Sequence, residues 1–147
     1  MLRYVLFFSL LAASKVTLAD DIDYIAGRYT YVSYAFTLPD GYSGGFREFG
    51  SSGATIEIGA DKSMVMTMHM LDGTRPVSRA EILEIDIKNG KGYMLVRWPE
   101  MASPVRQEFE TDGRTLSYVI RFRDPQDVIR YGGSDQGVLV REAATEK

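Results

Sequence analysis

The chain of 147 residues contains no cysteine, one histidine and one tryptophan. The absence of cysteine excludes disulfide bonds, thiol nucleophiles and thiolate metal ligands. The single histidine, His69, cannot build a histidine-rich metal centre, and the sequence contains no phosphate-binding loop, nucleophile elbow or zinc motif. The composition and the motifs therefore predict neither a metal site nor a cofactor.

Long apolar segments are also missing, with one exception near the N-terminus. An apolar run covers residues 4–13, follows the positive charge of Arg3, and precedes a more polar stretch that ends at Ala19. This order is typical of a secretory signal, and the run is about half as long as a membrane-spanning helix. We expect residues 1–19 to be a cleaved signal peptide. We expect residues 20–147 to form one secreted or periplasmic domain, with no stable membrane span after cleavage.

The chain also has no excess of positive charge. The chain has 17 lysine and arginine residues against 20 aspartate and glutamate residues, which gives a net charge of −3. Such an acidic chain is unsuited to bind nucleic acid, so no nucleic-acid partner is predicted. Residues 97–141 contain seven arginines and no lysine, and we expect most of these arginines to form cross-strand charge pairs with acidic residues on an exposed surface.

No segment shows helical periodicity over three turns, and most of the chain alternates apolar and polar residues with a period of two. Residues 81–88 alternate cleanly and are followed by Asn89-Gly90, a strong signal for a hairpin turn. Asp112-Gly113 marks a second hairpin. The turn spacing predicts an all-β fold: a single antiparallel up-and-down β-barrel of about eight strands, with an interior just large enough for one small ligand.

Three segments depart from this simple pattern. The predicted strand over residues 28–36 is apolar on both faces, which indicates either protein on both sides or a bend partway along the strand. Residues 42–53 are rich in glycine and serine but also contain aromatic side chains, so we expect a structured loop over a cavity mouth. Residues 128–131 are predicted to form a short strand.

The pattern resembles the lipocalin-like, or calycin, group of small β-barrels at three places. Residues 25–29 read IAGRY and residues 32–34 read VSY, where the group has Gly, any residue, then Trp, and often a Val-Ser-aromatic run. Residues 58–65, IGADKSMV, are similar to a strand, Asp-containing turn and Met-Ser-Val type strand of bacterial lipocalin-like domains. The last strand, predicted over residues 137–141, ends in VLVR.

The resemblance implies a closed barrel end, at which the C-terminal arginine folds over the aromatic residue of the first strand. Gly27, Tyr29 and Arg141 occupy the corresponding positions, with Tyr29 in place of the usual tryptophan. Fatty-acid-binding barrels of the wider group hold a carboxylate with an arginine and a tyrosine two residues later. This device is absent, because Glu142 and Ala143 follow Arg141.

The most unusual strand is predicted over residues 64–71, where Met64, Met66, Met68 and Met70 project to one face. Four thioethers in a row make a soft, adaptable apolar surface. This surface would be either a pocket wall for a flexible or flat apolar ligand or ordinary core filling. Thioethers also bind Cu(I), but no other ligand type in the sequence supports a copper site.

Tyrosines and one arginine complete the predicted ligand site. A set of tyrosines, together with Arg97 or Arg121, would orient the polar end of a ligand inside an apolar cup. The tyrosines are Tyr29, Tyr31, Tyr93 and Tyr118. The alternative is that these tyrosines are half-buried strand residues with hydrated hydroxyl groups. His69 projects to the face opposite the methionines, so it points to solvent if the methionines point inward.

The leading hypothesis is an exported lipocalin-like carrier or sensor that binds a small apolar molecule and has no catalytic residue. The alternative is a cofactor-free isomerase or cyclase whose cavity shapes the substrate. This enzyme would need His69 or an acid such as Glu57 to reach the cavity as a catalytic residue. A third hypothesis is a structural or interaction module that acts through its surface. The sequence favours a binding protein over an enzyme.

Overall fold

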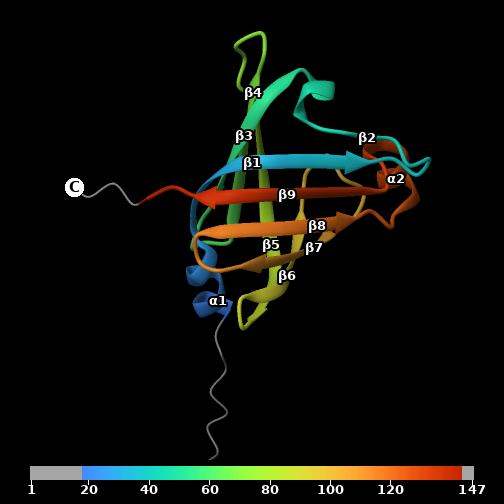
Figure 1. The fold of residues 1–147 in the computed structure, drawn as a ribbon. Helices are drawn as coiled ribbons and strands as arrows, with labels where there is room; N and C mark the ends of the chain where they lie inside the picture. Colours follow the sequence, from blue (N-terminus) through green and yellow to red (C-terminus); the bar gives the residue numbers. More distant parts are fainter. Residues whose placement is uncertain (1–17, 144–147) are drawn as a thin grey trace, which may run out of the picture.

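Strands joined by tight turns dominate the computed structural model, which describes residues 18–143 (Figure 1). All strands except β2 form a ring in the order β1-β3-β4-β5-β6-β7-β8-β9. Each strand pairs antiparallel with the next, and a pairing between β9 and β1 closes the ring. The short β2 pairs with the end of β1 outside this ring. The strands are β1 (Gly27–Thr37), β2 (Ser43–Gly44), β3 (Ser51–Ile58), β4 (Ser63–Met70), β5 (Val77–Lys88), β6 (Lys91–Arg97), β7 (Val105–Thr111), β8 (Thr115–Arg121) and β9 (Ser134–Arg141).

The predicted fold class is confirmed, because the protein is an all-β, up-and-down barrel of eight antiparallel strands with one short additional strand. The predicted hairpin joins β5 to β6 through Asn89 and Gly90, whose φ angles are 54° and 76°. Two-residue turns with positive φ angles favour this residue pair. The predicted signal peptide lies outside the described residues, except for Leu18 and Ala19 at the start of helix α1 (Leu18–Ile25).

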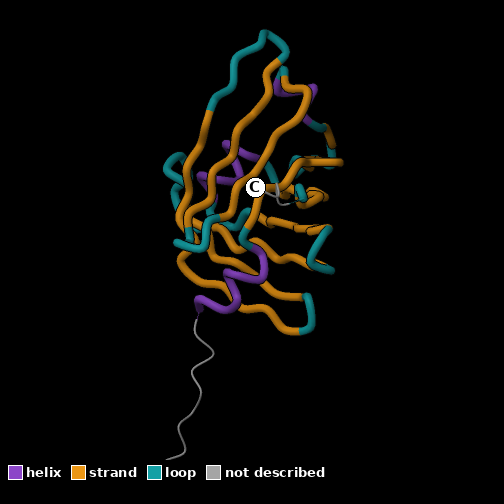
Figure 2. Tube along the Cα trace, turned by 90° about the vertical axis from the view of Figure 1, so that its left-hand side faces the viewer, coloured by secondary structure: helices purple, strands orange, loops and turns teal. Residues whose placement is uncertain are grey.

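Helical segments are few and short (Figure 2). Besides α1, there are a 3-10 helix, η1 (Phe46–Phe49), between β2 and β3, and helix α2 (Pro125–Tyr131) between β8 and β9. The hairpin between β4 and β5 projects beyond the other loops at the top of the molecule (Figure 2). None of the helices in the described part of the chain is long and apolar enough to cross a membrane.

A bulge in β1 explains why both faces of this strand are apolar. Tyr29 and Tyr31 point into the barrel. The register with β9 shifts after Tyr31, and beyond the shift Tyr34 and Phe36 point inward. Val32, at the shift, is 63% exposed. One extra residue changes which positions face inward, so the bend expected from the sequence is present.

Helix α1 covers one end of the barrel. Its Ile22 and Ile25 side chains are fully buried in the same core cluster as Tyr29. The Tyr29 hydroxyl donates to the Ile25 carbonyl at 2.8 Å and accepts from the Arg141 guanidinium, also at 2.8 Å. A Cβ atom on Gly27 would lie 3.3 Å from Nε of Arg141, so the glycine lets this guanidinium approach the backbone. The three positions that the resemblance assigns to the closed end are therefore in contact.

The prediction of a strand over residues 128–131 is wrong, because these residues belong to α2. Asp124 caps the helix, with its carboxylate accepting from the Gln126 backbone N–H at 2.9 Å. Pro125 takes the first helical position, where a backbone N–H has no partner within the helix. Helix α2 lies at the end of the barrel opposite α1 (Figure 1).

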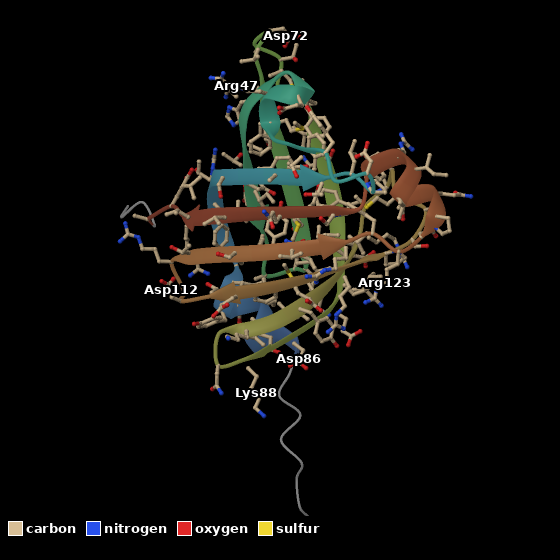
Figure 3. The ribbon with its side chains drawn as sticks, turned by 45° about the vertical axis from the view of Figure 1, so that its right-hand side comes forward. Arg47, Asp72, Asp86, Lys88, Asp112 and Arg123 are labelled. Atoms are coloured by element: carbon tan, nitrogen blue, oxygen red, sulfur yellow. The ribbon has the colours of Figure 1, made fainter. Side chains whose placement is uncertain are left out.

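Charged side chains cover the outside of the barrel. Those labelled in Figure 3 are all exposed and lie around its periphery. Ion pairs join neighbouring strands, among them Arg97 with Glu81 (3.9 Å) and Arg121 with Glu108 (3.6 Å). The expected cross-strand charge pairs are confirmed for these arginines. Exposed pairs of this kind contribute little to stability individually, about 0–1 kcal/mol.

Candidate ligand-binding cavity

One end of the barrel is hollow. A cavity of about 520 Å³ opens at the end beside α2 and η1, opposite the end that α1 covers. Its walls come mainly from the barrel strands, and its mouth is formed by η1, α2 and the connection between β6 and β7. A volume of this size is typical of sites that bind small organic molecules.

Methionines form an apolar wall of the cavity. On β4, Met66, Met68 and Met70 point into the cavity, whereas Met64 lies deeper in the filled core and is 1% exposed. Ile56 of β3 pairs with Met66 in the sheet and extends this wall. Unbranched thioether side chains adapt to the shape of whatever fills the space beside them.

The opposite wall carries polar groups. In the ring of eight strands, β8 lies directly opposite β4, and β9 and β1 are the next two strands after β8. Tyr118 of β8, Asp135 of β9, and Tyr31 and Tyr34 of β1 line the cavity from this side. The cavity therefore has one apolar side and one side with hydroxyl and carboxyl groups.

A glycine makes room for two of these tyrosines. A Cβ atom on Gly137 of β9 would come within 2.7 Å of the rings of both Tyr31 and Tyr118. The rings therefore pack over this glycine, and their hydroxyl oxygens are 2.6 Å apart. Burial raises the pKa of both phenols, so both are protonated at neutral pH and one donates to the other.

Asp135 places a carboxyl group inside the cavity. It pairs with Phe36 of β1 and Ile120 of β8, both of which are buried, so its side chain points inward with theirs. The Tyr34 hydroxyl donates to Oδ1 of Asp135 at 3.0 Å, and no ion pair among the described residues includes Asp135. Burial raises the pKa of this carboxyl to about 6, although the Tyr34 hydrogen bond opposes the shift.

Aromatic rings from η1 and β1 line one side of the mouth. Tyr34 stacks on Phe46 with ring centroids 4.5 Å apart, and Phe46 meets Tyr31 edge-on at 5.1 Å. Phe49 packs against Phe36 at 5.0 Å. Since Phe46 and Phe49 both line the cavity, the glycine-rich loop is structured and lies at the cavity mouth, as its aromatic content indicates.

Helix α2 and the connection between β6 and β7 form the other side of the mouth. Trp98 of the connection and Tyr131 of α2 line the cavity. The Tyr131 hydroxyl donates to the Glu100 carbonyl at 3.0 Å. The buried carboxylate of Asp127 accepts from the backbone N–H of Ala102 at 2.8 Å. These hydrogen bonds hold the helix and the connection together.

Most of the residues predicted to contact a ligand lie inside the barrel. Met66, Met68, Tyr31 and Tyr118 line the cavity, and Met64 lies below it in the core. The period-two alternation of β4 thus turns its methionine face inward. Contact between these side chains and a ligand stays a prediction.

Tyr93 and Arg121 lie on the outer face of the barrel instead. Tyr93 donates a hydrogen bond to Glu84 and lies beneath the Arg106 guanidinium, whose carbon is 3.8 Å from the ring centroid. Arg121 pairs with Glu108. Both side chains alternate with buried neighbours on their strands and therefore point outward. The prediction that these two residues reach the interior is wrong.

His69 and Glu57, the residues that the enzyme hypothesis needs, do not line the cavity. Glu57 is exposed on the outer face of β3. His69 projects from β4 to the face opposite the inward methionines, and its backbone carbonyl accepts from the Ser51 hydroxyl at 2.9 Å. Because the methionines occupy the inner face of β4, a histidine at an odd-numbered position of this strand cannot share it.

The sequence reasoning missed Asp135, Trp98 and Gln107, all of which line the cavity. For Asp135 a usable signal exists, because it shares the two-residue period of β9 with the fully buried Leu139. The last strand predicted from the sequence begins at Gly137 and so leaves the aspartate outside it.

Among the described residues, no group of three or more histidine, cysteine, aspartate or glutamate side chains is placed to hold a metal ion. Comparisons with known proteins find no matching family model, no matching curated protein and no matching solved structure.

Proposed function

We propose that the protein binds a small, largely apolar molecule in the hollow end of its barrel, as an exported carrier or sensor of the lipocalin-like kind. The observation that carries the proposal is the cavity of about 520 Å³, whose walls combine a methionine surface with a few convergent polar groups. Small-molecule sites are generally concave and mostly apolar, with a small number of placed polar groups that orient the ligand.

The closed end of the barrel supports the lipocalin-like part of the proposal. The contact of Arg141 with Tyr29 beside Gly27 is the arrangement that the resemblance implies. A barrel that is sealed at one end and hollow at the other admits a ligand from one side and shields its apolar part from water. This shielding is what carriage of an apolar molecule through water requires.

Binding can be measured with N-phenyl-1-naphthylamine, a neutral dye that fluoresces more strongly in apolar surroundings. We expect saturable binding to the purified protein. Met68→Trp fills part of the cavity and should weaken dye binding by about tenfold or more. Thr67→Trp, the matched control, places the same ring on the outer face of β4 and should leave binding unchanged. A folded protein that does not bind the dye, or equal losses in both variants, would contradict the proposal.

A second candidate function is proton transfer on a bound apolar substrate, as in a cofactor-free isomerase. The observation that favours it is Asp135, whose pKa burial raises to about 6, a value suited to accepting a proton near neutral pH. A proton taken from one carbon beside a carbonyl group would return to another carbon, so that substrate and product are isomers. Asp135→Asn should then abolish turnover without abolishing binding, whereas a pure carrier shows no turnover.

A further inference from the structure

Asp135 is a carboxylate inside an apolar cavity, and it has no positive partner among residues 18–143. The ion pairs among the described residues join exposed side chains, and none of them includes Asp135. Its Oδ1 atom accepts from Tyr34, which satisfies part of the group's hydrogen-bonding capacity. Ionising a carboxyl in such a place is unfavourable, and a ligand that brings a positive charge would offset this penalty.

We infer that the cavity accepts an apolar amine, whose protonated nitrogen lies between the Asp135 carboxylate and the aromatic rings of the mouth, and whose apolar part packs on the methionine wall. The inference rests on the proposed ligand-binding function and names the chemical class of the ligand. An ammonium group donates a charge-assisted hydrogen bond to a carboxylate. It is also attracted to the faces of aromatic rings.

Aromatic rings line two sides of the cavity that holds Asp135. Tyr34, whose hydroxyl bonds Asp135, stacks on Phe46 at 4.5 Å and meets Tyr31 edge-on at 6.0 Å. Trp98, the residue directly after β6, also lines the cavity, and β6 lies across the ring of strands from β1. The cavity that holds the carboxylate therefore has rings on opposite sides.

The polar and apolar walls suit the two ends of one molecule. Met66 and Met68 lie on β4, directly across the barrel from Tyr118 on β8. Asp135 lies on β9, which is opposite β5, the neighbour of β4. An amine nitrogen at Asp135 would leave its hydrocarbon part directed across the cavity toward the methionines. The flexible methionine side chains place little restriction on the shape of the hydrocarbon part. The cavity would therefore select a ligand by its amine nitrogen and its overall size.

Other titratable and charged groups near Asp135 do not replace the missing cation. They are Tyr31 and Tyr34 from β1, Tyr118 from β8, Arg130 and Tyr131 from α2, and Glu100 from the connection between β6 and β7. Burial raises the pKa of each of these tyrosines, so they are uncharged near neutral pH. The exposed guanidinium of Arg130 donates to the Glu100 carbonyl at 3.2 Å.

The same arrangement disfavours anionic ligands. A ligand carboxylate near Tyr34 would place a second negative charge beside Asp135 in an apolar environment, where like charges repel strongly. An alcohol of the same length would form a hydrogen bond with Asp135 but would bring no charge. We therefore expect affinity to decrease in the order amine, alcohol, carboxylic acid.

Decylamine, decanol and decanoic acid provide matched probes, because they share one hydrocarbon chain. Each is titrated against protein loaded with N-phenyl-1-naphthylamine, and its dissociation constant follows from dye displacement. Near pH 7.5 we expect decylamine to bind about tenfold or more tightly than decanol, with decanoic acid weakest. Asp135→Asn should remove the preference for decylamine over decanol. Glu57→Gln, which removes one exposed carboxylate from the outer face, should preserve it.

A pH series separates recognition by Asp135 from general attraction to an acidic protein. Between about pH 7.5 and pH 5, protonation of Asp135 should weaken decylamine binding by about tenfold, since its carboxyl titrates near 6. Decanol binding should not change over this range. The Asp135→Asn variant should show no pH dependence for either probe, and a folded variant that still prefers the amine would overturn the inference.

The possible outcomes distinguish this inference from the proposed function. If neither the dye nor any probe binds the folded protein, the proposed ligand-binding function is wrong and the inference falls with it. If the three probes bind equally well, the cavity binds apolar molecules but Asp135 does not select amines. If decanoic acid binds most tightly, the ligand class is anionic and the inference is overturned.

Discussion

A carboxyl group's position in the barrel decides the direction of its pKa shift. In the exposed turns, Asp61 and Asp72 accept hydrogen bonds from Ser63 and Thr74, and these bonds lower the pKa of each carboxyl. Asp135 is also hydrogen-bonded, but burial dominates and raises its pKa. Aspartates in the exposed turns are therefore ionised and stabilise those turns. The aspartate inside the cavity instead titrates near neutral pH.

We expect the stability difference between the parent protein and Asp135→Asn to change between about pH 4 and pH 7. An unfolded aspartate has a pKa near 3.9, whereas folding raises the pKa of Asp135 to about 6. The bound proton favours the folded state, so this stability is full below about pH 4 and is lost as the pH rises through 6. The parent should lose about 2–3 kcal/mol relative to the variant over this window.

Urea unfolding of both proteins at several pH values measures this difference. Subtracting the variant removes the contribution of the exposed aspartates, whose lowered pKa values act in the opposite direction and at lower pH. A difference that stays constant from pH 4 to pH 7 would show that Asp135 titrates as an ordinary exposed aspartate.

At the scale of elements, α2 shows how local capping favours a helix where the sequence predicts a short strand over residues 128–131. Asp124 satisfies a free N–H of the first turn and also accepts from the Ser103 hydroxyl at 2.6 Å. Asp127, one turn later, bonds the connection between β6 and β7. The helix is therefore held at its start by its own cap and along its length by the connection, and it keeps Tyr131 at the cavity mouth.

Asp124→Ala should destabilise the protein by about 1–2 kcal/mol, because it removes the N-cap of α2 and leaves the Gln126 N–H without its partner. Ile129→Ala provides the control in the same helix. The Ile129 side chain is 87% exposed, so its removal should change stability by less than about 0.5 kcal/mol. Chemical unfolding at neutral pH measures both changes, and equal effects would argue against the cap as the source of α2 stability.

At the scale of the whole molecule, the barrel is filled at one end and hollow at the other. Helix α1 adds Ile22 and Ile25 to the closed end, where Tyr29, Met64 and Leu116 are also fully or almost fully buried. Within residues 18–143, no such plug fills the opposite end, where side chains line an open cavity. The tightly packed core and the cavity of the proposed binding function therefore lie in different halves of one barrel.

Truncating two methionines on β4 tests this division. Met64→Ala removes a side chain from the filled end and should cost about 2–4 kcal/mol, since the surrounding core cannot collapse fully into the space. Met68→Ala enlarges an existing cavity and should cost about 1 kcal/mol, because Met68 has neighbours on fewer sides. Denaturant unfolding compares the two variants. Equal costs would indicate that the open end is packed as tightly as the closed end.

The sequence by itself determined most of the strands, their hairpins and the shared face of the β4 methionines. These features depend on neighbours along the chain: alternation sets which side chains share a face, and pairs such as Asn89-Gly90 select a turn. The contact between Tyr29 and Arg141 was also predictable, although only through the resemblance. For the strands and turns, a short stretch of sequence carries the whole signal.

Only the tertiary structure decided which tyrosines face the cavity and which groups surround Asp135. Tyr31 and Tyr34 share the inner face because a bulge shifts the register of β1, while Tyr93 points outward because Met94 takes the inner position. The surroundings of Asp135 come from three strands that meet only when β9 pairs with β1 and closes the ring. Burial, and with it the raised pKa, is a property of this closure, since no local pattern specifies which residues will surround a given side chain.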